Sequence, residues 1–273
     1  DLFSNQTEIP WLNSYEKSWK KITQNNKTPH AILISGNRGI GKRAFAAWLA
    51  TEHLDITTKY KGCIYPFAVP SHADLKWIRP NEGKRDISVD QIRQIIDDLS
   101  MSSYEGIGKV TVIEPVNKMN ISSANSLLKI LEEPPGNTLI ILIADKMKNI
   151  PATIISRCQH IKIYPPTEDE SREFINHIHP DANIGKIDPY ILVSPLIYEE
   201  QNNHSQNIES IINDLMSMLN KKNSPLDIAA RLSVEDAEIF LDWFSYFVYS
   251  LLRNAYRVNM QQSKFEEILN KLD

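Results

Sequence analysis

A short apolar run that leads into a glycine-rich loop and then a helix is the feature that most restricts the fold of this chain. The run AILIS (31–35) enters GNRGIGKR (36–43), and RAFAAWLATEHL follows with good helix formers and apolar residues at helical spacing. Gly36, Gly41 and Lys42 satisfy the G-x-x-x-x-G-K spacing of a phosphate-binding loop, in which backbone N–H groups surround phosphate oxygens. We therefore predict a buried parallel strand, a loop of P-loop ancestry and a helix.

The following residues alternate between apolar runs and helical patterns. Ser88 and Gln91 have the spacing of a capping box at the start of one helix, and Pro134 and Pro135 end another because proline cannot extend the hydrogen-bond ladder. Strands that alternate with helices indicate βαβ units, so we predict an α/β fold with a parallel sheet flanked by helices on both faces. The predicted strands are 31–35, 74–80, 109–115, 138–144 and 160–164.

The pattern changes near residue 165. Thr167 and Glu170 make a second capping box, and the strand signals fade beyond it. An apolar face over 239–252 indicates either the core of a helical region or a surface for a partner. The helices predicted for this part are 167–180, 208–222 and 233–258. The predicted domains are 1–165, 166–205 and 206–273.

The composition excludes several classes of protein. A net charge of −4 argues against a surface that binds nucleic acid over its whole extent, and Lys17, Lys20 and Lys21 are expected to form a solvated helix face. Two cysteines argue against a disulfide framework and fit a reducing, cytoplasmic location. Asp242 and Arg253 interrupt the most apolar stretch, so we expect no membrane-spanning helix. The opening DLFSNQTEIP has neither a signal-peptide pattern nor a Met, and we expect residues to precede it.

Two positions that an ATP-hydrolysing enzyme needs carry unsuitable side chains. Arg43 stands where a Ser or Thr would hold Mg²⁺, and it supplies no oxygen ligand. In VTVIEPVNKM, Glu114 takes the place of a metal-binding Asp and Pro115 that of the Glu that orients the attacking water. We therefore predict that this chain does not hydrolyse ATP, while weak nucleotide binding stays open. The vestigial loop consists of Gly36, Gly39, Gly41, Lys42 and Arg43.

A resemblance to a known family rests on two further motifs. ANSLLKILEEPP (124–135), followed by a strand and then ISRCQHIKI (155–163), resembles the AAA+ clamp-loader family, and within it the delta-prime subunits of bacterial DNA polymerase III. The resemblance runs from about Pro29 to Pro166 and implies an AAA+ P-loop module, a small helical lid and an all-α C-terminal collar region. The collar, here 206–273, is shorter than expected for the family, and we regard it as reduced or incomplete.

The resemblance also implies a role for the triplet Ser156, Arg157 and Cys158. In the family, its arginine acts in trans as an arginine finger at the ATP site of a neighbouring subunit. The alternative from the residues alone is that Arg157 caps the helix before the last strand and pairs with an acidic neighbour, while Cys158 is a packing residue. Ala144 stands at the place of a polar sensor, and ILVSPLIYEEQ lacks the Gly-Ser and Arg of the lid sensor. Both losses agree with a subunit that does not hydrolyse ATP.

No cofactor is expected. Many delta-prime subunits carry a four-cysteine zinc module, of which only Cys63 remains here, and one thiolate cannot hold structural zinc. Cys158, His160, His177 and His179 are of ligand-forming types, but we expect ordinary core or surface residues.

By this resemblance, the chain is not an enzyme by itself. It is expected to be a stator subunit in a ring with gamma/tau ATPase subunits and delta, and to reach the sliding clamp and primer-template DNA through that complex. An ATP-hydrolysing gamma/tau-like motor subunit of the same loader is the alternative function. A small-molecule P-loop kinase would leave the run 124–135 unexplained.

Overall fold

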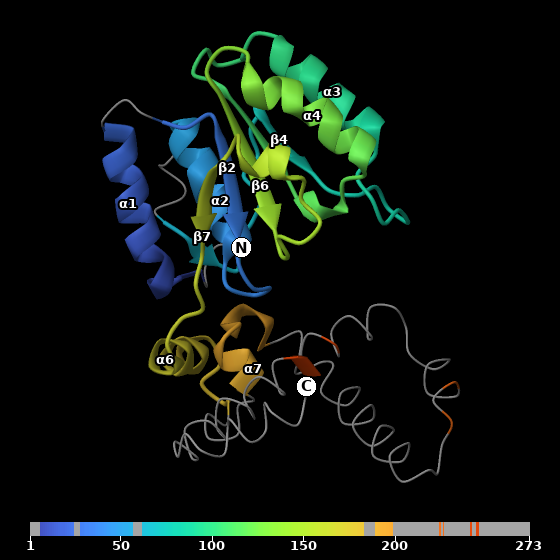
Figure 1. The fold of residues 1–273 in the computed structure, drawn as a ribbon. Coiled ribbons are helices and arrows are strands. Elements are labelled where there is room, and N and C mark those ends of the chain that lie inside the picture. Colours follow the sequence, from blue (N-terminus) through green and yellow to red (C-terminus); the bar gives the residue numbers. More distant parts are fainter. Residues whose placement is uncertain are drawn as a thin grey trace, which may run out of the picture. The chain divides into compact units, whose positions relative to one another are not determined.

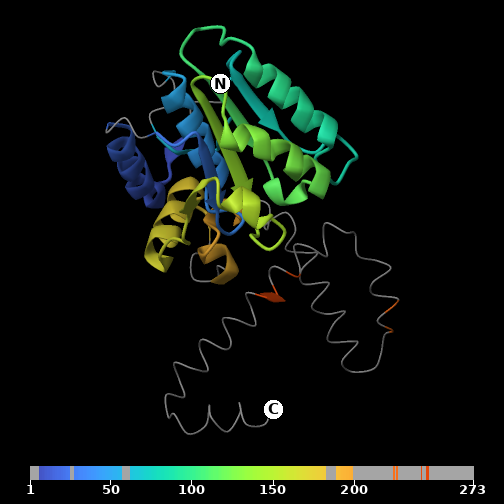
Figure 2. The ribbon, with the colours of Figure 1, turned by 45° about the horizontal axis from the view of Figure 1, so that its top comes forward.

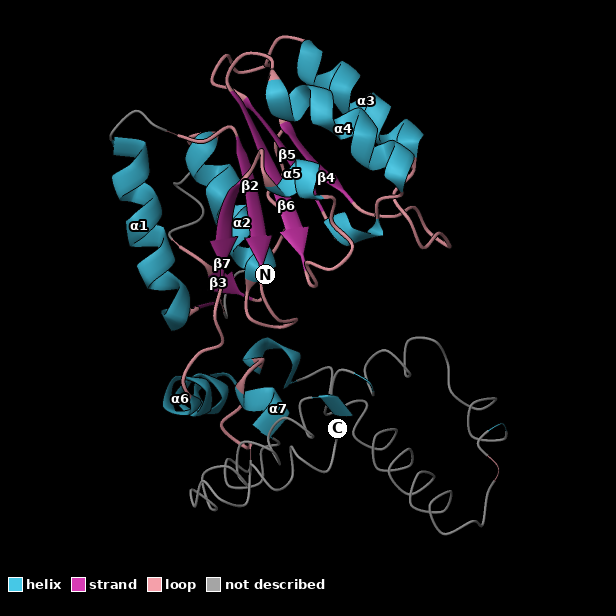
Figure 3. Cartoon of the chain, in the orientation of Figure 1, coloured by secondary structure: helices cyan, strands magenta, loops and turns pink. Residues whose placement is uncertain are grey.

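Five parallel strands form the central sheet, in the order β4-β5-β6-β2-β7. The computed structural model describes residues 6–24, 28–56, 62–182 and 189–198, together with Ser224, Leu226, Leu241, Phe244 and Ser245. Each strand predicted from the sequence is confirmed to within a few residues (Figure 3). The strands are β2 (Ala31–Ser35), β4 (Leu75–Ile78), β5 (Lys109–Ile113), β6 (Thr138–Ala144) and β7 (Gln159–Lys162).

Helices cover both faces of this sheet, as predicted (Figures 1 and 2). Side chains of β2 and β6 alternate between the two cores: Ile32 and Ile141 pack on one side, and Leu33 and Ile140 on the other. Strands buried on both faces need continuous apolar runs, which is why both are apolar almost throughout. The first face carries α1 (Asn13–Gln24) and α2 (Lys42–His53), and the second α3 (Val89–Ser100) and α4 (Ile121–Glu132).

Local signals set the ends of these helices. The capping boxes of Ser88 with Gln91 and of Thr167 with Glu170 are both confirmed, and the second begins α6 (Glu168–Ile178). The Asn120 side chain accepts a hydrogen bond from the Ser123 N–H at the start of α4.

Short elements complete the described chain. Two-residue strands β1 (Thr7–Glu8) and β3 (Ile64–Tyr65) pair antiparallel, which the sequence did not predict. The others are η1 (Pro10–Leu12), η2 (Val116–Lys118), α5 (Ala152–Ile155), α7 (Pro189–Leu192) and η4 (Pro195–Ile197).

The chain divides into two compact units. The first contains Asp1–Ile184 and Val193–Leu196, and therefore includes α6, and the second contains the remaining residues. The predicted helices at 208–222 and 233–258 and the apolar face over 239–252 lie outside the described residues, apart from the few named above. The domain boundaries near 165 and 205 stay predictions. Among the residues that the structure describes, no helix is long and apolar enough to cross a membrane.

Candidate functional site

The glycine loop lies where the sequence placed it, between the carboxyl end of β2 and the start of α2. Gly41 is the N-cap of α2 and has φ = 94°, a conformation that favours glycine. The loop also supports its neighbours: the Trp11 indole N–H donates to the Ile40 carbonyl at 2.9 Å, and the Leu196 N–H donates to the Gly39 carbonyl at 3.0 Å. The loop is thus part of the protein's packing even without a ligand.

The Lys42 ammonium is buried and fully engaged by the protein itself. Nζ donates to the carbonyls of Gly36 at 2.9 Å and Asn37 at 2.6 Å, and it lies 2.7 Å from Oδ1 of Asp145. An ammonium has three N–H donors, and here there are three acceptors. Burial lowers the pKa of Lys42, and the Asp145 carboxylate opposes that shift. A phosphate would have to compete with Asp145 for this charge.

Arg43 and Glu114, the two residues predicted to stand at former magnesium-binding positions, contact each other. The Arg43 guanidinium donates from Nε to Oε1 of Glu114, whose carboxylate is only 5% exposed. Oε2 of the same carboxylate accepts from the Trp77 indole at 2.9 Å and from NH2 of Arg79 at 3.2 Å. The Glu114 carboxylate, at the position expected from the sequence to bind metal, is therefore paired with two guanidinium groups and an indole. Pro115 follows it with no carboxylate of its own.

Three residues that pair with Lys42 or Glu114 are not predicted by the sequence: Trp77, Arg79 and Asp145. Ala144, the predicted altered sensor, is the buried last residue of β6. The ion pair with Lys42 is made by the next residue, Asp145. Arg79 and Asp145 each directly follow a strand at the carboxyl edge of the sheet. That position, where ligands of open α/β sheets bind, is the signal that could have identified them.

The triplet lies between the short helix α5 and β7. Nε of Arg157 donates to Oε1 of Glu132 at 2.8 Å, and NH1 donates to the Thr153 carbonyl at 2.9 Å. These are the contacts expected from the alternative interpretation, in which Arg157 caps the helix and pairs with an acidic residue. The Ser156 hydroxyl also donates to the Thr153 carbonyl, at 3.2 Å. Cys158 is half-buried beside the second core, and burial raises the pKa of its thiol to about 12.

The candidate metal ligands have other partners or surroundings. Cys63 is buried, its backbone N–H donates to the Glu16 carboxylate at 2.7 Å, and burial raises the pKa of its thiol well above the usual value. The Ser35 hydroxyl and Nε2 of His160 are 2.7 Å apart. Within the described ranges, no three His, Cys, Asp or Glu side chains gather as a metal site. The absence of zinc stays a prediction.

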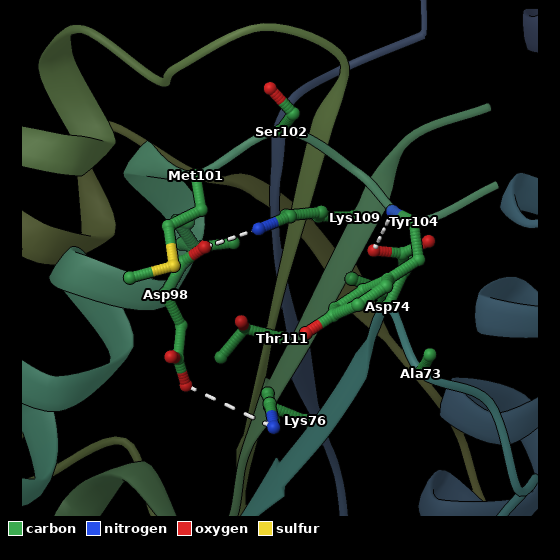
Figure 4. A pocket seen from close by; sticks show the side chains of 11 residues that line it. Ala73, Asp74, Lys76, Asp98, Met101, Ser102, Tyr104, Lys109 and Thr111 are labelled. Atoms are coloured by element: carbon green, nitrogen blue, oxygen red, sulfur yellow. Dashed lines mark hydrogen bonds and ion pairs between the residues drawn. The ribbon is translucent and has the colours of Figure 1, made fainter. Parts of the chain in front are cut away.

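A separate pocket of 230 Å³ is lined by residues at the amino ends of β4 and β5 (Figure 4). Because all five strands are parallel and the glycine loop follows the carboxyl end of β2, this is the opposite end of the sheet. The buried Asp74 accepts hydrogen bonds there from the N–H groups of Tyr104 at 2.9 Å and Glu105 at 3.2 Å. The Lys109 ammonium donates to the Asp98 carbonyl. Asp74 thus holds the loop after α3, and Lys109 contacts the last turn of α3 itself.

The parallel strand order β4-β5-β6-β2-β7, with the glycine loop directly after β2, is that of a P-loop α/β domain of the AAA+ type. Residues 11–167, more than half of the chain, match the family described as DNA polymerase III, delta subunit. The chain belongs to this family.

Two proteins similar in sequence and one solved structure illustrate what the chain resembles. The delta-prime subunit of DNA polymerase III from Pseudomonas aeruginosa is 28% identical over 258 residues, which cover 89% of this chain and 77% of that protein. The gamma subunit from Buchnera aphidicola subsp. Schizaphis graminum is 33% identical over 156 residues, 56% of this chain and 43% of that protein. A DNA polymerase III gamma subunit-related protein from Thermotoga maritima is a solved structure with a TM-score of 0.44 and 20% identity over 84% of this chain and 76% of that one.

Proposed function

We propose that this chain is the delta-prime-like stator of a DNA polymerase III clamp loader, a subunit that does not hydrolyse ATP. The observation that carries the proposal is the pairing of Arg43 with Glu114. A guanidinium at the position of the Mg²⁺ ligand is paired with the carboxylate that would bind the metal, so the chain's own cation takes the place of magnesium. Lys42 is likewise paired with Asp145, where a phosphate would be expected.

Membership of the family supports a proposal about partners. The chain is proposed to assemble with gamma/tau and delta subunits in the cytoplasm and to support loading of the sliding clamp on primer-template DNA through that complex. Its own chemical contribution is Arg157, which would act in trans at the ATP site of a neighbouring ATPase subunit. The 34% exposed side chain is accessible to such a neighbour.

The trans role is tested by Arg157→Ala in a loader reconstituted from full-length subunits. An arginine finger is worth about a thousandfold or more at the site that it serves. The variant should therefore silence one ATP site, which lowers the number of ATP molecules hydrolysed in a single DNA-dependent turnover, while the complex still assembles. Arg93→Ala is the matched control, because Arg93 is also an exposed arginine with an acidic partner, Asp90. Unchanged hydrolysis in Arg157→Ala would refute the trans role.

The alternative is a gamma/tau-like motor subunit, which the identity to a gamma subunit favours. It predicts Mg²⁺-dependent ATP hydrolysis by the isolated chain that is lost in Lys42→Ala. The stator hypothesis predicts no ATP hydrolysis above background by the isolated wild-type chain or by Lys42→Ala.

A further inference from the structure

Glu132 is the acidic partner of Arg157, and its place in the chain is fixed by local structure. It is the last residue of α4, and Pro134 and Pro135 follow closely and prevent the helix from continuing. A carboxylate in the last turn lies near the negative end of the helix dipole, where a cation is favoured. The Arg157 guanidinium supplies that cation and joins the end of α4 to the Thr153 carbonyl of α5.

The contacts orient the guanidinium without using all its donors. Nε and NH2 lie 2.8 and 2.5 Å from Oε1 of Glu132, and NH1 lies 2.9 Å from the Thr153 carbonyl oxygen. An arginine has five N–H donors in a planar fork, so one remains on each terminal nitrogen. The only further acceptor near them in the described chain is the Ser156 hydroxyl, at 3.5 Å from NH1 and at the limit of hydrogen bonding. These two remaining donors, on NH1 and NH2, are the outer edge of the fork, and a phosphate can accept hydrogen bonds from them.

We propose that Glu132 is the positioning residue of the arginine finger: it holds the inner edge of the Arg157 guanidinium so that the outer edge faces the neighbour's nucleotide. This inference rests on the proposed trans role of Arg157. An arginine side chain without such a partner is flexible, and each phosphate contact would first have to order it. Glu132 therefore acts through Arg157 and does not itself meet the nucleotide.

The adjacent residue Glu133 provides a matched control. It is also exposed, it lies at the same helix end, and within the described part of the chain its carboxylate takes no hydrogen bond or ion pair. Glu132→Ala and Glu133→Ala therefore remove the same charge from the same surface, but only the first removes a partner of Arg157.

The experiment is a double-mutant cycle in the reconstituted loader. DNA- and clamp-stimulated ATP hydrolysis is measured for Glu132→Ala, Arg157→Ala, the double variant and Glu133→Ala, together with the affinity of assembly. An exposed ion pair is worth up to about fivefold in an equilibrium constant. We expect Glu132→Ala to lower the rate of hydrolysis at the one site that Arg157 serves by about two- to fivefold, with KM and assembly unchanged. Glu133→Ala should have no effect, and the double variant should equal Arg157→Ala.

The outcomes separate the inference from the proposed function. If Arg157→Ala lowers hydrolysis while Glu132→Ala does not, or if Glu132→Ala accelerates it, the positioning role is wrong and the trans role stands. An equal loss on removing Glu132 from the wild type and from the Arg157→Ala variant would also overturn the positioning role, because Glu132 would then act independently. If Arg157→Ala itself has no effect, the proposed function fails.

Discussion

The Lys42 ammonium and the Asp145 carboxylate lie 2.7 Å apart, so the charge of the loop's lysine is neutralised from within the same chain. The pair joins the loop after β2 to the residue after β6, and these two strands are direct neighbours in the sheet. Lys42 is 6% exposed and Asp145 46% exposed, so the partner is accessible while the ammonium is buried. An incoming phosphate therefore meets the carboxylate first.

Asp145→Asn should increase the affinity of the loop for polyphosphate. A charge-assisted hydrogen bond contributes about 1.5–3 kcal/mol, so removing the competing charge should tighten binding by about tenfold or more. Calorimetric titration with pyrophosphate, and with ATP in the absence of Mg²⁺, measures this change. Asp97→Asn, which removes an exposed carboxylate on α3, is the control and should leave binding unchanged. Equal affinities of the wild type and Asp145→Asn would show that Asp145 does not compete with phosphate for Lys42.

Arg43→Thr should destabilise the protein and should not restore hydrolysis. The buried Glu114 carboxylate would lose one guanidinium and keep Arg79 and Trp77, at a cost of about 1–3 kcal/mol in the free energy of unfolding. Urea unfolding measures this loss, and an assay with Mg²⁺ and ATP should stay at background because Pro115 still supplies no carboxylate.

The control for this prediction is Arg93→Thr, the same substitution in another helix. Arg93 and its partner Asp90 are 69% and 90% exposed, and such pairs contribute about 0–1 kcal/mol. Equal losses in the two variants, or Mg²⁺-dependent turnover in Arg43→Thr, would contradict the role assigned to the Arg43–Glu114 pair.

The fold could be predicted from the sequence where local signals decide it. The apolar runs of β2 and β6 are buried on both faces, and Ser88 and Thr167 start helices through their own side chains. The β1–β3 pair could not be predicted, because strands of two residues are too short to show a period and their pairing joins segments far apart in the chain.

The candidate site also contains residues that the sequence predicts and residues that it does not. Spacing alone identified Lys42 and Arg43, since both lie in one continuous motif. Their partners Asp145 and Glu114 depend on which strands are neighbours, and the sequence states only the order of strands along the chain. Glu114 was found because the expected motif includes it, whereas nothing in that motif points to Asp145.

The two thiols should react slowly in the native protein. Burial raises the pKa of Cys158 from 9.0 to about 12, which lowers its thiolate fraction by roughly a thousandfold at pH 8. A chromogenic disulfide reagent should therefore label both cysteines rapidly in urea and slowly without it. The folded state keeps the Cys158 proton between about pH 9 and 12 while the unfolded chain loses it, so rising pH through this window favours unfolding. Rapid labelling of one native thiol would contradict the assigned burial.

Gly36→Ala should lower the free energy of unfolding more than Gly83→Ala, because neighbouring atoms pack against Gly36 and none lie near Gly83. A Cβ at Gly36 would lie 2.6 Å from the Ile163 carbonyl oxygen and 2.4 Å from Cδ1 of Ile40, at φ = 151°. A backbone atom cannot yield as a side chain can, so we expect a loss of about 2–4 kcal/mol in the free energy of unfolding. Gly83 also has positive φ, 72°, but a Cβ there would meet nothing within 4 Å, and its replacement should cost only about 1–2 kcal/mol of backbone strain. Urea unfolding of both variants without nucleotide measures the difference. Equal losses in the two variants would contradict the packing role assigned to Gly36.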